Sequence, residues 1–201
     1  MRTSTRREFI DGQAGRIECA VDAPDAAPIG VALVAHPHPL FGGTLDNKVV
    51  QTLAKACVDL GWVAYRPNFR GVGETAGTHD GGRGELDDLA LVLSHARSGR
   101  EALPVALAGF SFGAALQVQL AARVRPAKLV LVGVAVTHFA LPAAPAGTVL
   151  IHGEQDETVP LAAVLDWARP QDLPVTVLPG ADHFFHRRLN LLRDIVIRNL
   201  R

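Results

Sequence analysis

One short segment, residues 109–113 (Gly-Phe-Ser-Phe-Gly), constrains the fold of this chain more than any other. An apolar run at 105–108 leads into it and small, helix-forming residues follow, so the pattern predicts a sharp turn from a strand into a helix. Strand and helix backbones come close together in such a turn, which favours glycine on both sides of Ser111. The pattern is that of the G-x-S-x-G nucleophile elbow, although a glycine-flanked serine in an ordinary strand-to-helix turn fits these residues equally well.

Strand-like and helix-like segments alternate through the middle of the chain. The predicted strands are 29–35, 62–65, 104–108, 128–134, 148–151 and 175–178, and the predicted helices are 48–60, 85–97, 112–123, 160–168 and 186–200. Residues 7–10 and 16–21 predict an antiparallel hairpin before them. This order predicts an α/β fold, a doubly wound and mostly parallel sheet with helices on both faces. Because no linker or repeat divides the 201 residues, we expect 1–201 to form a single domain.

The loops with unusual sequences all follow predicted strands, after residues 35, 66, 108, 151 and 178. The carboxyl ends of parallel strands share one edge of a sheet, and ligands bind beyond that edge. Residues 70–77 continue into further glycines, and we expect this Gly-rich segment to be a mobile loop. Candidate functional residues are therefore expected at this one edge.

Charge and composition limit the range of partners. Twenty basic residues balance twenty acidic ones, so no net field favours nucleic acid or an anionic membrane surface, and a small-molecule partner is expected. The longest apolar stretch, 129–136, is too short to span a bilayer, and no apolar signal segment is found near Met1. Cys19 and Cys57 lie in different segments, which predicts reduced thiols. We expect a cytoplasmic protein without a leftover apolar stripe that would demand oligomerisation.

A serine nucleophile needs a base, and the chain has eight histidines. His183 is the strongest candidate because its loop, 179–185, follows the last predicted strand and so reaches the same edge as Ser111. His186 is expected to be solvated or to cap the last helix, and His95 lies within a helix. His152 is expected to be a packed residue at a strand end.

The base in turn needs an acid that orients it, and the loop at 152–160 supplies one. Asp156 stands after the turn that follows the strand and before the short helix, which makes it the preferred candidate. Glu154 and Glu157 compete, and either could merely cap or solvate the loop. Asp182 adjoins the candidate base, but sequence neighbours rarely point at each other with the required geometry.

The three candidates occur in the order Ser111, Asp156, His183, which is the order of the α/β-hydrolases. With these motifs the chain resembles a small α/β-hydrolase, close to compact bacterial members that carry a His-Pro-His-Pro-x-x-Gly-Gly stretch, found here at 36–43. The resemblance runs from residue 29 to the last helix. Residues 70–77 resemble the family stretch R-G-x-G-x-S-x-G, with threonine where serine is usual.

Two backbone N–H groups are expected to form an oxyanion hole. The first is that of Phe112, at the positive end of the elbow helix. The resemblance implies a second N–H group after the third strand, where the family commonly has His-Gly and the residue that follows donates its N–H. This chain has proline in place of that glycine and again two residues later, and proline has no N–H. The alignment favours His38 as the donor, with Leu40 as the alternative.

A metal-dependent hydrolase is a competing hypothesis, because His36 and His38 together with Asp156 could suggest ligands. Both histidines precede prolines, no third ligand stands at a recognisable spacing, and the elbow would be left unexplained. We therefore expect neither a metal nor a cofactor.

The residues and the resemblance together predict a serine hydrolase, carboxylesterase-like, that cleaves small or medium acyl esters through an acyl-enzyme. A thioesterase or peptidase on the same triad is the alternative, and a non-catalytic binding module is less favoured because no triad member is lost. The short connection between 134 and 148 leaves no room for a cap, so a lidless site is expected. Phe41, Phe110 and Phe184 are candidate apolar walls.

Overall fold

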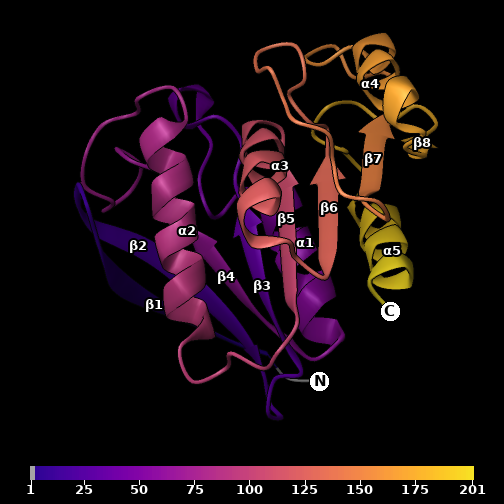
Figure 1. Ribbon diagram of the computed structural model, residues 1–201. Coiled ribbons are helices and arrows are strands. Elements are labelled where there is room, and N and C mark those ends of the chain that lie inside the picture. Colours follow the sequence, from indigo (N-terminus) through magenta and orange to yellow (C-terminus); the bar gives the residue numbers. More distant parts are fainter. Residues whose placement is uncertain (1–2) are drawn as a thin grey trace.

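The computed structural model describes residues 3–201, which form a mostly parallel sheet covered by helices on both faces (Figure 1). The strands are β1 (Thr3–Gly12), β2 (Gly15–Pro24), β3 (Gly30–Ala35), β4 (Trp62–Pro67), β5 (Val105–Phe110), β6 (Lys128–Val132), β7 (Val149–Gly153) and β8 (Val175–Leu178). Their order in the sheet is β1-β2-β4-β3-β5-β6-β7-β8. The pairs from β4 to β8 are parallel, whereas β1 and β2 form an antiparallel hairpin that pairs antiparallel with β4. The α/β fold and the amino-terminal hairpin predicted from the sequence are confirmed.

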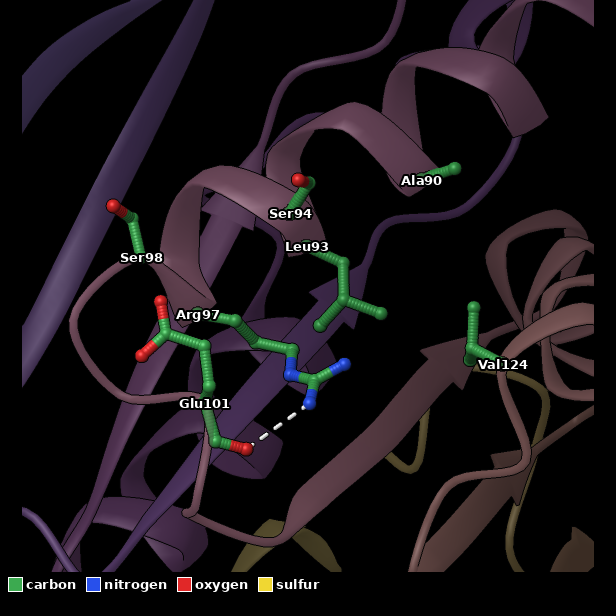
Figure 2. Close-up of a pocket in the computed structure, with 7 residues that line it drawn as sticks. All are labelled: Ala90, Leu93, Ser94, Arg97, Ser98, Glu101 and Val124. Carbon is green, nitrogen blue, oxygen red and sulfur yellow. Dashed lines mark hydrogen bonds between the residues drawn. The ribbon is translucent and has the colours of Figure 1, made fainter.

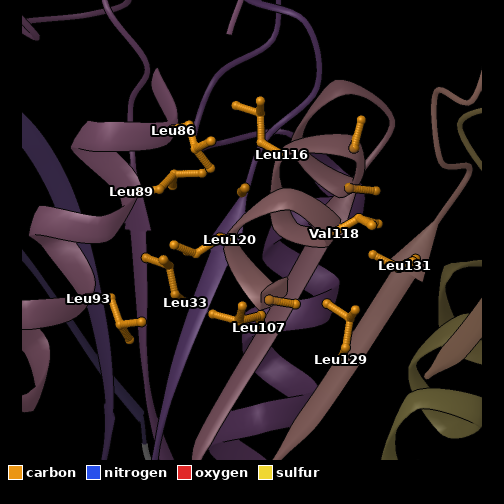
Figure 3. Packing of buried hydrophobic residues seen from close by; sticks show 14 of the residues in the cluster. Leu33, Leu86, Leu89, Leu93, Leu107, Leu116, Val118, Leu120, Leu129 and Leu131 are labelled. Atoms are coloured by element: carbon orange, nitrogen blue, oxygen red, sulfur yellow. The ribbon is translucent and has the colours of Figure 1, made fainter. Parts of the chain in front are cut away.

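The helices divide between the two faces of the sheet. They are α1 (Lys48–Asp59), α2 (Arg83–Arg97), α3 (Phe112–Val124), α4 (Leu161–Ala168) and α5 (Leu189–Leu200). Side chains of α2, α3 and α4 share one hydrophobic cluster with alternate strand residues, and side chains of α1 and α5 share the other. In Figure 3, leucines of α2 and α3 interdigitate above Leu33 of β3 and Leu107 of β5. The sheet is therefore buried on both sides, as its continuous apolar strands predict.

The β3 strand shows why both faces are apolar. All six of its residues are buried, and consecutive side chains enter opposite clusters: Leu33 lies in the α2 and α3 cluster, whereas Val34 lies in the α1 and α5 cluster. The helix that follows, α1, begins at a well-formed cap, because the Asn47 side chain accepts hydrogen bonds from the N–H groups of Val49 and Val50.

The last helix begins later than the sequence predicts. The α5 helix starts at Leu189 rather than at 186. Phe185 and Arg187 have φ angles of 56° and 61°, so the chain takes left-handed turns where a helix was expected. The Asp182 side chain also accepts a hydrogen bond from the N–H of His186, which stabilises this turn structure before the helix.

The Gly-rich segment, for which the sequence predicts a mobile loop, is hydrogen-bonded to neighbouring elements in the structure. Arg70 donates two hydrogen bonds to Asp88 of α2, at 2.7 and 3.1 Å, and it also lies 3.5 Å from Asp80. The buried Thr75 hydroxyl donates to the carbonyl of Asn68 and accepts from the N–H of Glu18. These contacts fasten the segment to α2 and to the hairpin, and a count of glycines alone does not reveal them.

The connection between β6 and β7 carries neither a helix nor a strand within residues 133–148. It therefore adds no cap over the carboxyl edge of the sheet, and the expected lidless architecture is confirmed. Among the helices of residues 3–201, none is long and apolar enough to cross a membrane.

Candidate active site

Ser111 stands between the last residue of β5 and the first residue of α3, in a strained backbone conformation. Its φ and ψ angles are 55° and −115°, which a non-glycine residue adopts only when its surroundings impose them. A Cβ atom added at Gly113 would lie 2.4 Å from the carbonyl oxygen of His36 and 2.5 Å from that of Ala35. One added at Gly109 would lie 2.6 Å from backbone atoms of α3. The close backbone approach predicted for the elbow is thus what excludes side chains from both glycine positions.

His183 and Asp156 form a buried hydrogen-bonded pair. His183 lies in the loop after β8 and Asp156 in the loop after β7, and the distance from Nδ1 of the imidazole to Oδ2 of the carboxylate is 2.7 Å. A carboxylate can only accept, so the proton is on Nδ1 and Nε2 is left as the basic nitrogen. Both side chains are almost fully buried, at 6% and 0% exposure.

The other oxygen of Asp156 is held by the backbone of its own loop. Oδ1 accepts hydrogen bonds from the N–H groups of Thr158 at 2.9 Å and of Val159 at 2.7 Å. His152, buried at the end of β7 as expected, donates from Nε2 to the carbonyl oxygen of Val159 and lies 3.4 Å from Oδ2 of Asp156. Burial lowers the pKa of His152, so this ring stays neutral beside the carboxylate. Asp156 is therefore fixed on both sides before any ligand binds.

Ser111 and His183 line one hollow of about 370 Å³ at the carboxyl edge. The remaining lining residues come from the loop after β3, the start of α1 and the loops after β7 and β8: Pro37, His38, Phe41, Gly42, Gly43, Asn47, Thr158 and Phe184. The imidazole of His183 rests against Gly133, where an added Cβ would lie 3.3 Å from the ring. Within the described residues, Ser111 and His183 are not hydrogen-bonded to each other, and such contacts often tighten only when substrate binds.

The loop after β3 is tightly folded around His38. Its ring nitrogen Nδ1 accepts a hydrogen bond from the N–H of Leu40 at 3.2 Å, so that N–H is occupied. Within residues 3–201 neither the N–H of His38 nor that of Phe112 has a hydrogen-bond partner. An added Cβ at Gly43 would lie 2.0 Å from the carbonyl oxygen of Pro37, which explains the glycine there. The geometry therefore favours His38 over Leu40 as a free donor.

His36 is a buried residue whose function the sequence did not reveal. Nδ1 lies 2.7 Å from the carbonyl oxygen of Pro37, and Nε2 accepts from the N–H of Phe69 at 2.9 Å. Both contacts require the neutral imidazole, with its proton on Nδ1. Burial lowers the pKa of His36 to about 4. His36 thus joins the loop after β3 to the loop after β4.

The three phenylalanines expected as apolar walls lie in different places. Phe41 and Phe184 line the hollow and are 85% and 45% exposed. Phe110 is fully buried and does not line it, because its ring packs on His183 with centroids 4.8 Å apart. The expectation for Phe110 is corrected accordingly: it supports the imidazole from the core of the sheet.

The competing candidates lie elsewhere. Glu154 accepts from the N–H of Gly180 at 2.7 Å, and His186 is paired with Asp182 on the surface. His95 lies on α2, where its Nε2 is 3.3 Å from Glu8. In the part of the chain that the structure describes, none of these side chains is hydrogen-bonded to Asp156 or His183.

A second hollow has a volume of about 410 Å³, and Figure 2 shows the residues that line it. It is lined by the last turns of α2, the end of α3 and the turn before β5, with Arg97 donating to the backbone carbonyl of Glu101 at 3.1 Å. Because α2 ends and β5 begins at the amino edge of the sheet, this hollow is at the edge opposite the turn between β5 and α3 (Figure 1).

Within residues 3–201, no group of three or more His, Cys, Asp or Glu side chains is arranged to hold a metal ion.

The chain is similar to known proteins over its whole length. A family model described as serine aminopeptidase, S33, matches residues 42–146. The uncharacterized protein RP471 of Rickettsia prowazekii is 31% identical in an alignment 201 residues long, which covers 88% of this chain and 81% of that protein.

Two solved structures extend the similarity to three dimensions. XC6422 from Xanthomonas campestris, described as an α/β serine hydrolase without a lid, has a TM-score of 0.92 at 36% identity and covers 100% of this chain and 95% of its own. An α/β serine hydrolase homologue from Coxiella burnetii has a TM-score of 0.90 at 39% identity, with 98% and 97% coverage. The elbow, the lidless edge and these similarities lead to one conclusion: the chain belongs to the S33 family of the α/β-hydrolase superfamily and is a serine hydrolase.

Proposed function

We propose that the protein is a carboxylesterase in which Ser111 is the nucleophile, His183 the general base and Asp156 the acid that orients it. One observation carries the proposal: the buried 2.7 Å contact between Asp156 and His183 holds the imidazole beside the hollow that also contains Ser111. Because the proton is on Nδ1, the lone pair of Nε2 is the one available to the serine.

The reaction is acyl transfer to water. The Oγ atom of Ser111 attacks the ester carbonyl carbon while Nε2 of His183 takes the hydroxyl proton, and the tetrahedral intermediate forms. The single bond between the acyl carbon and the alcohol oxygen then breaks as the imidazolium returns its proton to that oxygen. Water, deprotonated by the same imidazole, then attacks the carbonyl carbon of the acyl-enzyme and forms a second tetrahedral intermediate. Its bond to Oγ breaks as the imidazolium returns the proton to Oγ, which releases the carboxylic acid and free Ser111.

The negative oxygen of each intermediate is stabilised by the N–H groups of Phe112 and His38. Both are free of other partners within the described residues, and the Phe112 N–H is at the amino end of α3, where the helix dipole favours an anion. Removing one such donor typically lowers kcat by about 10²–10³. Leu40 is the alternative donor only if its hydrogen bond to the His38 ring breaks.

The acyl group is expected to lie against Phe41 and Phe184, the exposed apolar side chains of the hollow. A volume of about 370 Å³ and the absence of a cap within residues 133–148 favour short or medium acyl chains in an open site. A thioester carbonyl fits the same arrangement.

An aminopeptidase is the second candidate, and a specific observation favours it. A hollow of about 380 Å³ shares Thr158, His183 and Phe184 with the first, and it also has the carboxylates of Glu157 and Asp182 in its lining. A carboxylate at this position would bind the ammonium group of a peptide. Asp182 is already paired with His186 at 2.6 Å, so Glu157 is the residue left to do so.

A fluorophosphonate probe tests the nucleophile directly, because it phosphonylates an activated serine with loss of fluoride. We expect stoichiometric labelling of the wild type and none of the Ser111→Ala variant. Labelling that is equal in the two proteins, or absent from the wild type, would contradict the serine hydrolase mechanism proposed for this site.

A substrate series separates the two candidate functions. Turnover of p-nitrophenyl esters that decreases beyond medium chain length, with no turnover of aminoacyl p-nitroanilides, is the expected result. Faster turnover of the anilides, lost in Glu157→Gln, would favour the aminopeptidase instead. A preference for acyl-CoA over p-nitrophenyl esters would identify a thioesterase.

A further inference from the structure

A second carboxylate–imidazole pair lies beside the site, and the proposed mechanism does not use it. Glu85, in the first turn of α2, is fully buried, and its Oε1 lies 2.8 Å from Nδ1 of His79. The Glu85 carboxylate also accepts from the N–H groups of Asp80 at 3.3 Å and Gly82 at 2.9 Å. Within residues 3–201, His79 is the only basic side chain within ion-pairing distance of the Glu85 carboxylate.

The His79 ring packs on both residues whose N–H groups are proposed to bind the oxyanion. Its centroid is 4.7 Å from the His38 ring and 5.5 Å from the Phe112 ring, and the His38 and Phe112 rings are 4.9 Å apart. The His79 side chain is only 12% exposed, so it is held between its neighbours. Three aromatic side chains, from the loop after β3, the loop before α2 and the start of α3, thus form one packed group.

The position of the His38 ring determines the shape of its loop. Nδ1 of that ring accepts the N–H of Leu40 and so caps the 3₁₀ turn Pro39–Phe41, which the bond from the Phe41 N–H to the His38 carbonyl closes. The prolines on both sides of His38 leave the backbone little freedom to adjust. Because the ring is hydrogen-bonded to Leu40, a displaced ring would break this contact and loosen the turn that begins at His38.

The Gly-rich segment is also packed closely against the helix that carries Phe112. An added Cβ at Gly82 would lie 3.1 Å from the Leu116 side chain and 3.7 Å from the Phe112 ring. Since the Gly82 N–H donates to Glu85, the same carboxylate that fixes His79 also fixes this contact with α3. Burial beside His79 additionally lowers the pKa of His38, which keeps the His38 ring neutral and able to accept the Leu40 N–H.

We propose that Glu85 and His79 are a positioning pair for the oxyanion hole. The buried carboxylate orients the His79 ring, and the ring holds the N–H groups of His38 and Phe112 in the relative positions that bind the oxyanion. The inference rests on the proposed function of Ser111. Neither residue lines the hollow beside Ser111, so their effect is expected on the stability of the tetrahedral intermediate and not on the binding of the ester.

Two variants separate the parts of this pair. His79→Phe keeps a ring and loses the hydrogen bond to Glu85, whereas Glu85→Gln keeps the side-chain volume and loses the negative charge. We expect each to lower kcat by about 10–100-fold with KM within about twofold of the wild type, because small misplacements of catalytic groups have effects of this size. The double variant should be no slower than the slower single variant, because both changes break one interaction.

A trifluoromethyl ketone provides a readout that general destabilisation does not move. Ser111 adds to its carbonyl and forms a stable oxyanion adduct, so its affinity reports on the oxyanion hole. Affinity should fall in parallel with kcat/KM in both variants, when expressed per serine labelled by fluorophosphonate. His95→Phe is the matched control, because it removes another histidine–glutamate contact, 3.3 Å long, at the remote side of α2. It should leave kcat and ketone affinity unchanged.

Three results would overturn the positioning pair. They are wild-type kcat and ketone affinity in both variants, a loss confined to KM, and a loss of the same size in the His95→Phe control. Failure of the proposed function would look different, since hydrolysis would then persist in Ser111→Ala or labelling would be absent from the wild type.

Discussion

Asp156 is the residue on which the geometry of the proposed base depends. One of its oxygens accepts two backbone N–H groups of its own loop, and the other faces the Nδ1–H of His183. Both oxygens of the carboxylate are therefore held by N–H donors. A substitution that keeps the shape and alters the hydrogen-bonding chemistry therefore tests this residue directly.

Asp156→Asn is expected to lower kcat by about 10³–10⁴ while the protein remains folded. The amide oxygen will face the N–H groups of Thr158 and Val159, which leaves the NH₂ group facing His183. The imidazole must then place its proton on Nε2, where it cannot accept the serine proton. Steady-state turnover of a p-nitrophenyl ester, with circular dichroism to confirm folding, measures the effect.

Glu157→Gln is the matched control for this prediction. Glu157 is the next residue in the loop and is exposed, and within the described residues it forms no hydrogen bond to the His183 imidazole. Ester turnover close to that of the wild type is expected. An inactive Glu157→Gln together with an active Asp156→Asn would exchange the roles of the two carboxylates.

At the scale of elements, the site is made by the ends of strands that the sheet brings to one edge. The elbow after β5 packs on the end of β3, and the loops after β7 and β8 meet at the Asp156 and His183 pair. The approach of α3 to β3 is the tightest of these contacts, because Gly113 leaves no space for a methyl group against two carbonyl oxygens.

Gly113→Ala is expected to lower the free energy of unfolding by about 1–3 kcal/mol, as overpacking of a rigid interior does. It should also lower kcat, since the shift separates Ser111 and Phe112 from the loop of His38. Urea denaturation and ester turnover measure the two effects. Wild-type kcat in a destabilised Gly113→Ala would contradict the link between this packing and the site.

Gly99→Ala is a useful comparison because it destabilises for another reason. Gly99 has open space around it but a φ of 72°, so alanine there is strained by about 1–2 kcal/mol without a clash. Gly99 lies in the turn after α2, at the amino edge of the sheet. Its substitution should therefore reduce stability and leave kcat unchanged.

The elements themselves were largely predictable from the sequence, and the reasons are physical. Continuous apolar runs such as 30–35 identify strands covered on both faces, and a pentapeptide that needs close backbone approach identifies the elbow. The sequence also predicts the candidate site residues Ser111, Asp156 and His183. Each lies in a loop after a parallel strand, and those loops share one edge of the sheet. Their catalytic roles remain proposals, but the structure brings all three to that edge.

The rest could not be predicted, because it depends on contacts between loops that are distant in the sequence. The His36 ring accepts a hydrogen bond from the Phe69 N–H, which joins two loops. Arg70 donates to Asp88 and so connects the Gly-rich segment to α2. Glu85 did carry a local signal, since a glutamate three residues after a helix cap often accepts the cap N–H. Nothing in that signal points to His79 or to its contact with His38.

For the whole molecule, His36 connects the stability of the fold to pH. The imidazole must be neutral to donate to Pro37 and accept from Phe69, and burial lowers its pKa from 6.5 to about 4. Above pH 6.5 both the folded and the unfolded chain are neutral here, so His36 has no pH-dependent effect. As pH falls from 6.5 to about 4, the unfolded chain binds a proton that the folded state excludes, and stability is lost.

A shift of this size corresponds to about 3 kcal/mol of lost stability across that window, an order-of-magnitude value for one buried group. His152 acts in the same direction, because burial also lowers its pKa. Carboxylates respond at lower pH: the N–H of Gly84 lowers the pKa of Asp80 below its ordinary 3.8, so its contribution is lost only as pH falls through that lower value. Loss of stability between about pH 6.5 and 4 is therefore attributed mainly to the two buried imidazoles.

His36→Gln tests this attribution, because the glutamine oxygen can still accept the Phe69 N–H but does not titrate. Urea denaturation of both proteins at about pH 7.5 and about pH 5 should show a lower stability of the variant at the higher pH and a smaller loss on acidification. His186→Gln, at a side chain that is 73% exposed, should keep the full pH dependence of the wild type. If His36→Gln also keeps the full pH dependence of the stability, the acid sensitivity of this fold comes from another group. The contact between the loops after β3 and β4 then does not depend on the protonation of His36.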